Sequence, residues 1–187
     1  MLLSIMKFKS KARNLINLKL KSAKVPKIYY FKVSNFRKKS EKILNSIKKK
    51  FGGKIAVRSS SAKEDSFKTS NAGKFKSFLN VDPKNLKFLE QNINSVIKSF
   101  GKNKKGNDEV FIQDMVKNVH ISGVATSCDK DTYAPYYNIN FTRNKDTSIV
   151  TSGKNGSESF IFFKYSKTEP KIKFLKKIIN LLRELEK

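Results

Sequence analysis

A run of short strand-like segments in the second half of the chain constrains the fold most. Between residues 109 and 165, five such segments follow one another at turn-sized spacing: 109–116, 122–127, 136–141, 147–153 and 158–165. Strands joined by short turns can pair antiparallel with their chain neighbours, so we expect a β-meander. After residue 169, apolar residues recur at three- and four-residue steps, which predicts a final amphipathic helix.

The first half mixes helix and strand signals. Amphipathic segments predict helices over about 10–20, 35–50 and 84–100. Apolar, β-prone segments predict strands at about 28–33, 55–60 and 74–81. The predicted class is therefore α+β: a mixed helix and strand front lobe, followed by an antiparallel sheet and a C-terminal helix.

Composition supports a packed domain. The chain is 38% hydrophobic and has fifteen Phe and six Tyr, which suits a folded core rather than a disordered tail. No apolar run approaches the ~20 residues that span a bilayer, and the first residues lack the order of a secretory signal. The lone Cys128 excludes an internal disulfide framework. We therefore expect a cytoplasmic protein without a membrane partner.

The formal net charge of +26 raises the possibility of a nucleic-acid partner. Almost all of this charge is lysine, and it is spread over every segment. Arginine, which is favoured for bidentate phosphate and base-edge contacts, occurs only five times. A lysine-rich nucleic-acid-binding protein stays an alternative, but a general compositional drift explains the charge as well.

The densest polar cluster follows the apolar segment 55–60. Arg58 lies near the end of this predicted strand, and a loop of small and polar residues, 60–73, comes next. A strand would hold the guanidinium rigidly, while a small-residue loop lets backbone N–H groups approach an anion. The cluster indicates phosphate binding. The alternative is a plain polar turn in which Arg58 pairs with Glu64 or Asp65.

The segment VRSSSAKEDSFKTSNAGKFKSFLNV (57–81) resembles the ATP-binding domain of pyruvate phosphate dikinases and phosphoenolpyruvate synthases. The shared pattern reads Val57–Ser60, Glu64-Asp65, Ser70–Gly73, Phe75, Ser77 and Leu79–Val81. The resemblance implies an ATP-grasp-like fold. It also implies that Arg58, Ser70 and Gly73 bind the phosphates of ATP.

Two further segments carry the resemblance. SKARNLINLK, with Val25-Pro26 after it, is similar to the opening of the family and gives Lys11 the position of a nucleotide-phosphate lysine, although Ser10 stands where glycine is usual. IQDMV (112–116) resembles the segment that joins the two lobes. There Gln113 would face the exocyclic amine of adenine, and the main chain of Met115 and Val116 would contact its edge. The alternatives are an ordinary exposed lysine and an ordinary strand.

The resemblance also implies what the sequence lacks. In the family, a strand with acidic metal ligands and then a Gln-x-Arg segment follow a helix like the last one here, and residues 1–187 contain neither. We therefore expect a single incomplete ATP-grasp-type domain over residues 1–187, with a first lobe to about residue 110 and the start of a second lobe from about residue 111. We assign no catalytic residue and no metal ligand, and Mg²⁺ is expected only together with ATP.

The functional hypothesis is the ATP-binding part of a phosphotransferase of this type. The chain would then be one piece of a split enzyme completed by a second polypeptide, a truncated product, or a reused binding module. A non-catalytic interaction module, with an exposed sheet edge that accepts a partner strand, is the remaining alternative. The phosphoryl acceptor does not follow from the sequence.

Overall fold

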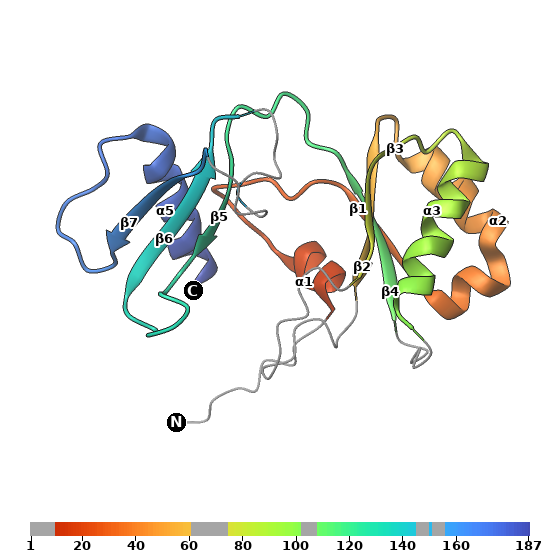
Figure 1. The fold of residues 1–187 in the computed structure, drawn as a ribbon, viewed down its shortest axis with the longest axis horizontal. Coiled ribbons are helices and arrows are strands. Elements are labelled where there is room, and N and C mark those ends of the chain that lie inside the picture. Colours follow the sequence, from red (N-terminus) through yellow and green to blue (C-terminus); the bar gives the residue numbers. More distant parts are fainter. Residues whose placement is uncertain (1–9, 61–74, 102–107, 145–149, 151–155) are drawn as a thin grey trace. The chain divides into compact units, whose positions relative to one another are not determined.

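The computed structural model describes residues 10–60, 75–101, 108–144, 150 and 156–187 (Figure 1). The chain divides into two compact units. Unit 1 comprises Met1–Leu18 and Val25–Val116, and unit 2 comprises Lys19–Lys24 and Lys117–Lys187. Each unit has a sheet and a hydrophobic core of its own.

Unit 1 is built on a four-stranded antiparallel sheet. Its strands are β1 (Ile28–Lys32), β2 (Ile55–Ser60), β3 (Ser77–Val81) and β4 (Glu109–Asp114), in the order β1-β4-β2-β3. The expectation that residues 109–116 begin the second-half meander was therefore wrong. This strand lies between β1 and β2 instead, because its two apolar faces are buried by partners that are distant in sequence.

Both faces of this sheet carry apolar residues, since side chains alternate along each strand. On one face, helices α2 (Val33–Lys50) and α3 (Leu86–Ser99) cover a core that includes Val57, Ile112, Ile47, Ile93 and Val96. On the other face lies the short helix α1 (Lys11–Asn17), whose Ala12 packs against Ile28 and Phe111. Figure 1 shows α1 on one side of the sheet and α2 and α3 on the other.

Of the two long helices of unit 1, α3 has a side-chain cap at its N-terminus and α2 has a break near its middle. The side chain of Asn85 caps α3 by accepting a 3.1 Å hydrogen bond from the backbone N–H of Phe88. Helix α2 has non-helical dihedral angles at Lys39 (φ −144°, ψ 43°), so it consists of two helical segments that meet there.

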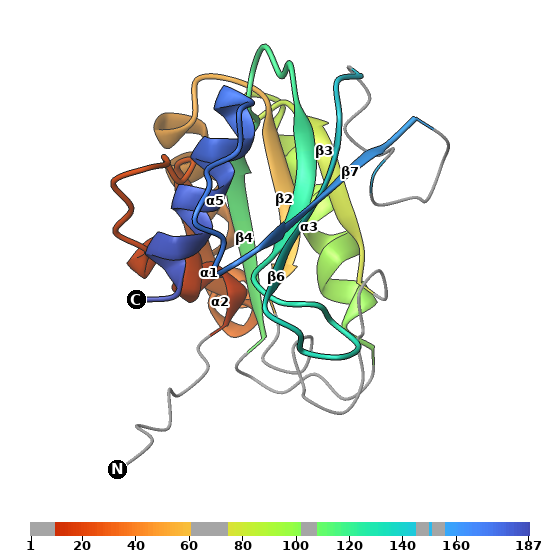
Figure 2. The ribbon, with the colours of Figure 1, turned by 90° about the vertical axis from the view of Figure 1, so that its left-hand side faces the viewer.

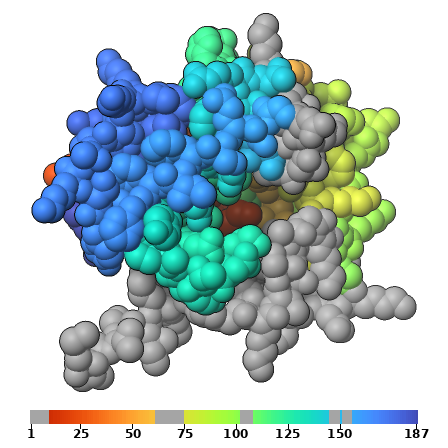
Figure 3. Space-filling view, turned by 60° about the vertical axis from the view of Figure 1, so that its left-hand side comes forward, coloured from red at the N-terminus to blue at the C-terminus, as the bar shows by residue number. Residues whose placement is uncertain are grey.

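In the described residues, unit 2 contains a three-stranded antiparallel meander and helix α5. Strands β5 (Ser122–Thr126), β6 (Tyr136–Thr142) and β7 (Glu158–Phe163) pair in that order, as the turn spacing predicted. Helix α5 (Lys173–Leu185) covers one face through Leu175, Ile179 and Leu182. Helix α5 lies on a single side of β6 and β7 (Figure 2). In Figure 3, residues 156–187 are the blue part of the surface.

The predicted α+β class is confirmed, with a mixed front half followed by an antiparallel sheet and a C-terminal helix. This arrangement is consistent with an ATP-grasp-like domain. The expected strand at 147–153 falls almost wholly outside the described residues. In the described part of the chain, no helix has both the length and the apolar character needed to cross a membrane.

Candidate functional site

The face of the unit 1 sheet that α2 and α3 leave open carries a row of polar side chains. Arg58 and Ser60 come from β2, and Glu109 and Gln113 come from β4. The register pairs Ser60 with Glu109, Arg58 with Phe111 and Ala56 with Gln113. Since residues two apart on a strand share a face, all four polar side chains project on the side where α1 lies.

Arg58 lies in the middle of this row and is only partly exposed. Its Nε is buried and has no hydrogen-bond partner among the residues that the structure describes. A buried charged donor without a partner costs about 1–3 kcal/mol or more. The proposed pairing with Glu64 or Asp65 falls outside the described residues. An anion that accepts a hydrogen bond from Nε would remove this cost.

Lys11 is the first residue of α1 and its side chain is exposed. Ser10, which precedes it, has φ −57° and ψ 154°. These angles suit any residue, so the chain needs no glycine at this position. The Ser10 carbonyl accepts a 2.9 Å hydrogen bond from the N–H of Asn14, which closes the first turn of the helix.

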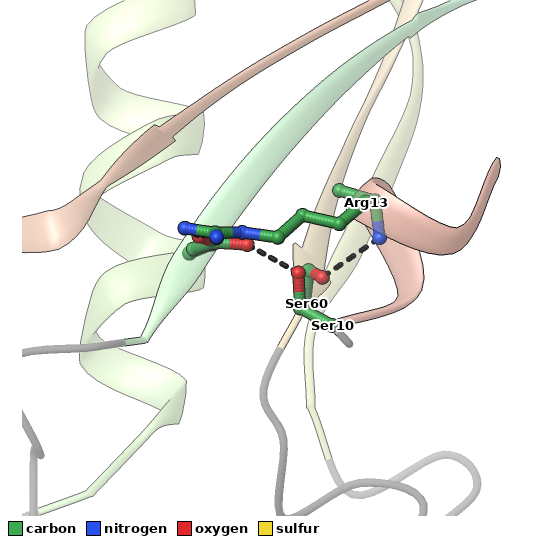
Figure 4. A network of polar contacts seen from close by, with 5 residues as sticks. Ser10, Arg13 and Ser60 are labelled. Atoms are coloured by element: carbon green, nitrogen blue, oxygen red, sulfur yellow. Dashed lines mark hydrogen bonds and ion pairs between the residues drawn. The ribbon is translucent and has the colours of Figure 1, made fainter. Parts of the chain in front are cut away.

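A buried polar network fixes α1 to the sheet (Figure 4). The backbone N–H of Ala12 donates to Ser60 Oγ at 3.0 Å. Arg13 donates from Nε at 2.9 Å and from Nη2 at 2.7 Å to Glu109 Oε1, and Ser10 Oγ donates to Glu109 Oε2. Glu109 is only 2% exposed, so its charge depends on these partners.

The network joins three parts of the candidate site. It connects the helix that begins with Lys11 to the strand of Arg58, through Ser60, and to the strand of Gln113, through Glu109. The hydrogen bond from Arg13 to Glu109, together with the charge of the carboxylate, raises the pKa of Arg13 above its ordinary value. The guanidinium therefore stays charged, and the ion pair holds α1 in place.

Gln113, Met115 and Val116 lie at the end of β4 and just beyond it. Gln113 is half-buried and pairs with Ile28 on one side and Ala56 on the other. The N–H of Met115 donates to the carbonyl of Lys54 at 3.1 Å, so it is engaged within the protein. Val116 is 62% exposed and is the last residue of unit 1.

Comparison with known protein families gives one match, which covers most of the chain. Residues 9–179 match the family described as pyruvate phosphate dikinase, AMP/ATP-binding domain. The chain belongs to this family. The suspected resemblance is thereby confirmed, and the polar face of unit 1 lies in an AMP/ATP-binding domain of the pyruvate phosphate dikinase type. A search of curated proteins found no match.

The residues of this AMP/ATP-binding domain fit an anionic nucleotide. Arg58 offers a buried donor that lacks a partner in the described part of the chain, and Lys11 offers an exposed ammonium group on an anchored helix. Ser70 and Gly73 lie outside the described residues, so their part in phosphate binding stays a prediction. Within the described ranges, no group of three or more His, Cys, Asp or Glu residues could hold a metal ion.

Sequence reasoning missed Ser10, Arg13, Ser60 and Glu109 as supporting residues. One signal was present: Glu109 is a carboxylate at the start of an apolar strand, in a chain with 41 Lys and Arg against 15 Asp and Glu. A carboxylate in such a strand is buried only with a partner. The sequence could not reveal which of the many cations fills that role.

Proposed function

We propose that the open face of the unit 1 sheet binds ATP, with its phosphates at Lys11 and Arg58. The Ser70 and Gly73 region would add backbone donors to the phosphates. Gln113 would bind the exocyclic amine of adenine. Because the Met115 N–H already donates to Lys54, the edge contacts would come from the Met115 carbonyl and the Val116 main chain.

The observation that carries this proposal is the buried Nε of Arg58, which has no hydrogen-bond partner within the described residues. The guanidinium is held on a central strand, and it shares a sheet face with Gln113 one strand away. The buried network holds the helix of Lys11 against the same face. Such fixed donors lose little freedom when they bind an anion, which favours affinity for phosphate groups.

The wider role that we propose is that of the ATP-binding part of a phosphotransferase, in which residues 1–187 belong to a single incomplete ATP-grasp-type domain. ATP would bind as its magnesium complex, since Mg²⁺ bridges and neutralises phosphate oxygens. The phosphoryl acceptor and a second polypeptide that would complete the reaction are proposals that rest on the resemblance to the family alone.

Isothermal titration calorimetry with ATP, with and without Mg²⁺, tests the proposal on the full chain. We expect saturable binding that weakens when Arg58 is replaced by alanine. The loss should be at least about 1.5 kcal/mol, the value of a hydrogen bond from a charged group. Arg37→Ala is the matched control, because it removes the same charge from an exposed position on α2.

Two outcomes would contradict the proposal. A folded sample that shows no heat with millimolar ATP would exclude nucleotide binding by this chain. Equal ATP affinity in the Arg58→Ala and Arg37→Ala variants would show that the phosphates bind elsewhere. Circular dichroism of both variants confirms that each is folded before the titration.

A further inference from the structure

A second basic site lies beside the edge strand of unit 1. In the described sheet, β1 is the end strand and pairs with β4 only. A cavity of about 680 Å³ lies next to it, between β1 and residues 35–46 of α2. We call it the edge cavity. It is separate from Arg58 and Gln113, which do not line it.

The edge cavity runs along the side of β1, not over one face of it. Four consecutive residues, Tyr29–Lys32, line it. Consecutive side chains of a strand point to opposite faces of the sheet. A cavity that contacts all four must therefore follow the edge, where a strand presents main-chain N–H and C=O groups to an additional strand.

The wall of the edge cavity is strongly basic. Lys32, Lys38, Lys39 and Lys42 line it together with Arg13, and its described lining contains no Asp or Glu. Arg13 is already paired with Glu109. Among the described residues, the four lysines have no carboxylate within ion-pair distance. Within the described residues, no ion pair thus compensates the charge of these four lysines.

These lysines do not stabilise the helix that carries them. The break at Lys39 divides α2, so Lys42 lies in the first turn of the second segment and Lys38 and Lys39 directly precede that turn. Positive side chains oppose the helix dipole at this end and favour it at the other, where Lys48–Lys50 lie.

Both tyrosine rings of the cavity are already engaged by cations. The Lys50 ammonium lies 5.5 Å from the ring centre of Tyr29, and the Arg13 guanidinium lies 5.6 Å from that of Tyr30. Proteins that bind single-stranded nucleic acids offer open aromatic faces to stacked bases. The edge cavity combines an open strand edge with a basic wall instead.

We propose that the edge cavity binds an extended acidic peptide segment of a partner protein. The peptide adds to β1 as a fifth strand through main-chain hydrogen bonds, and its Asp or Glu side chains pair with Lys38, Lys39 and Lys42. Strand addition accounts for the position of the cavity along the edge, and the acidic side chains match the charge of its wall. This interaction is independent of ATP binding on the open face.

Fluorescence anisotropy with the full chain tests the charge requirement. The probe is a fluorescein-labelled eight-residue peptide of alternating Glu and Thr. We expect the Lys38→Ala/Lys42→Ala variant to bind it about tenfold more weakly than the wild-type chain, because both ion pairs are lost. The control is Lys48→Ala/Lys49→Ala, which removes the same charge from the same helix outside the cavity and should change the affinity less than about twofold.

A modified peptide tests strand addition without any change to the protein. N-methylation at alternate residues removes the N–H donors along one edge of the peptide and keeps its charge. Of the two possible methylation patterns, one should weaken binding by about tenfold, through the loss of several main-chain hydrogen bonds. Equal affinities for both methylated peptides and the parent peptide would overturn the proposal.

The same variants separate the proposal from nucleic-acid binding. Equal peptide affinity in the Lys38→Ala/Lys42→Ala variant and its control would overturn the peptide proposal. If an oligo-dT probe then lost affinity in the Lys38→Ala/Lys42→Ala variant alone, the cavity would be a nucleic-acid site. ATP titration of both variants should match the wild-type chain, which shows that the open face is intact.

Discussion

The two units cover their sheets differently. In unit 1, α2 and α3 cover one face of the sheet, and the small cluster around Ala12 and Phe111 covers part of the other. In unit 2, α5 covers one face only. The opposite face of that sheet leaves apolar side chains exposed, among them Ile161 at 66% and Phe163 at 41%.

The two sheets therefore differ in what lies on the face that is not covered by the main helices. Unit 1 places a buried ion pair and a helix on its second face, and these contacts fix where Lys11 and Arg58 lie. Unit 2 depends for its stability on a single layer of apolar contacts between its sheet and α5. The two units should therefore respond differently to the loss of one buried side chain, and the following substitutions test this from the largest expected effect to the smallest.

The core of unit 2 should be the more fragile one. Ile179 lies on α5 and is fully buried against the sheet, so Ile179→Ala should cost about 2–5 kcal/mol. Hydrogen exchange measures the effect: amides of β6 and α5 should lose protection while those of β2 and β4 keep it. Ile47→Ala in unit 1, also fully buried, is the matched control and should show the reverse pattern. Equal loss of protection in both units would refute separate stability.

The ion pairs of the two units should differ in their contribution to the free energy of unfolding. Removing the buried Glu109 by Glu109→Ala leaves Arg13 and Ser10 without their partner and should cost about 2–3 kcal/mol, somewhat below a fully buried pair because Arg13 is 41% exposed. The control is Glu158→Ala in unit 2, whose pair with Arg143 is more than half exposed on both sides and should be worth under about 1 kcal/mol. Urea denaturation compares the two. Equal losses would mean that the Glu109 network does not hold α1.

Unit 2 should also lose stability at high pH. Burial, followed by the hydrogen bond to Glu186, raises the pKa of Tyr137 to about 12 from an ordinary value of 10.0. A raised pKa means that the folded state favours the neutral phenol, so its contribution is complete below pH 10 and is lost as pH rises toward 12. The loss is at most about 2.7 kcal/mol. Urea denaturation across this range checks it, and Tyr137→Phe should remove this part of the pH dependence.

The open face of the unit 2 sheet should tolerate change best. Ile161→Ser replaces a 66% exposed side chain and should alter stability by less than about 0.5 kcal/mol. A thermal melt followed by circular dichroism measures this. A loss above 2 kcal/mol would show that Ile161 is covered in solution, which would contradict a sheet with one packed face.

Local signals in the sequence predicted most elements, because they depend on nearby residues. The strand at 55–60 has the predicted bounds, and the helices at 86–99 and 173–185 lie within the expected segments. The partners of β4 could not be predicted. Its apolar pattern fits a strand in either sheet, and only contacts with β1 and β2, far away in sequence, decide its place.

In the candidate site, too, some residues could be proposed from local sequence and others could not. Arg58 was proposed as a site residue because a motif of fixed spacing surrounds it, and its role in binding stays a prediction. The contacts that hold the helix of Lys11 in place could not be predicted. They depend on Ser10 and Arg13 meeting Glu109, and the last two are 96 residues apart in the chain. The serine that replaces the usual glycine donates to this carboxylate.

The buried Nε of Arg58, which finds no acceptor among the residues that the structure describes, has a thermodynamic consequence. A donor that is buried without an acceptor lowers the stability of the folded chain, and an anion that supplies the acceptor restores it. Such a ligand binds the folded chain and not the unfolded one, so folding and ligand concentration become linked. At a ligand concentration one hundred times Kd, this linkage adds about 2.7 kcal/mol to the free energy of unfolding. The fraction of the chain that resists proteolysis would then follow the supply of nucleotide.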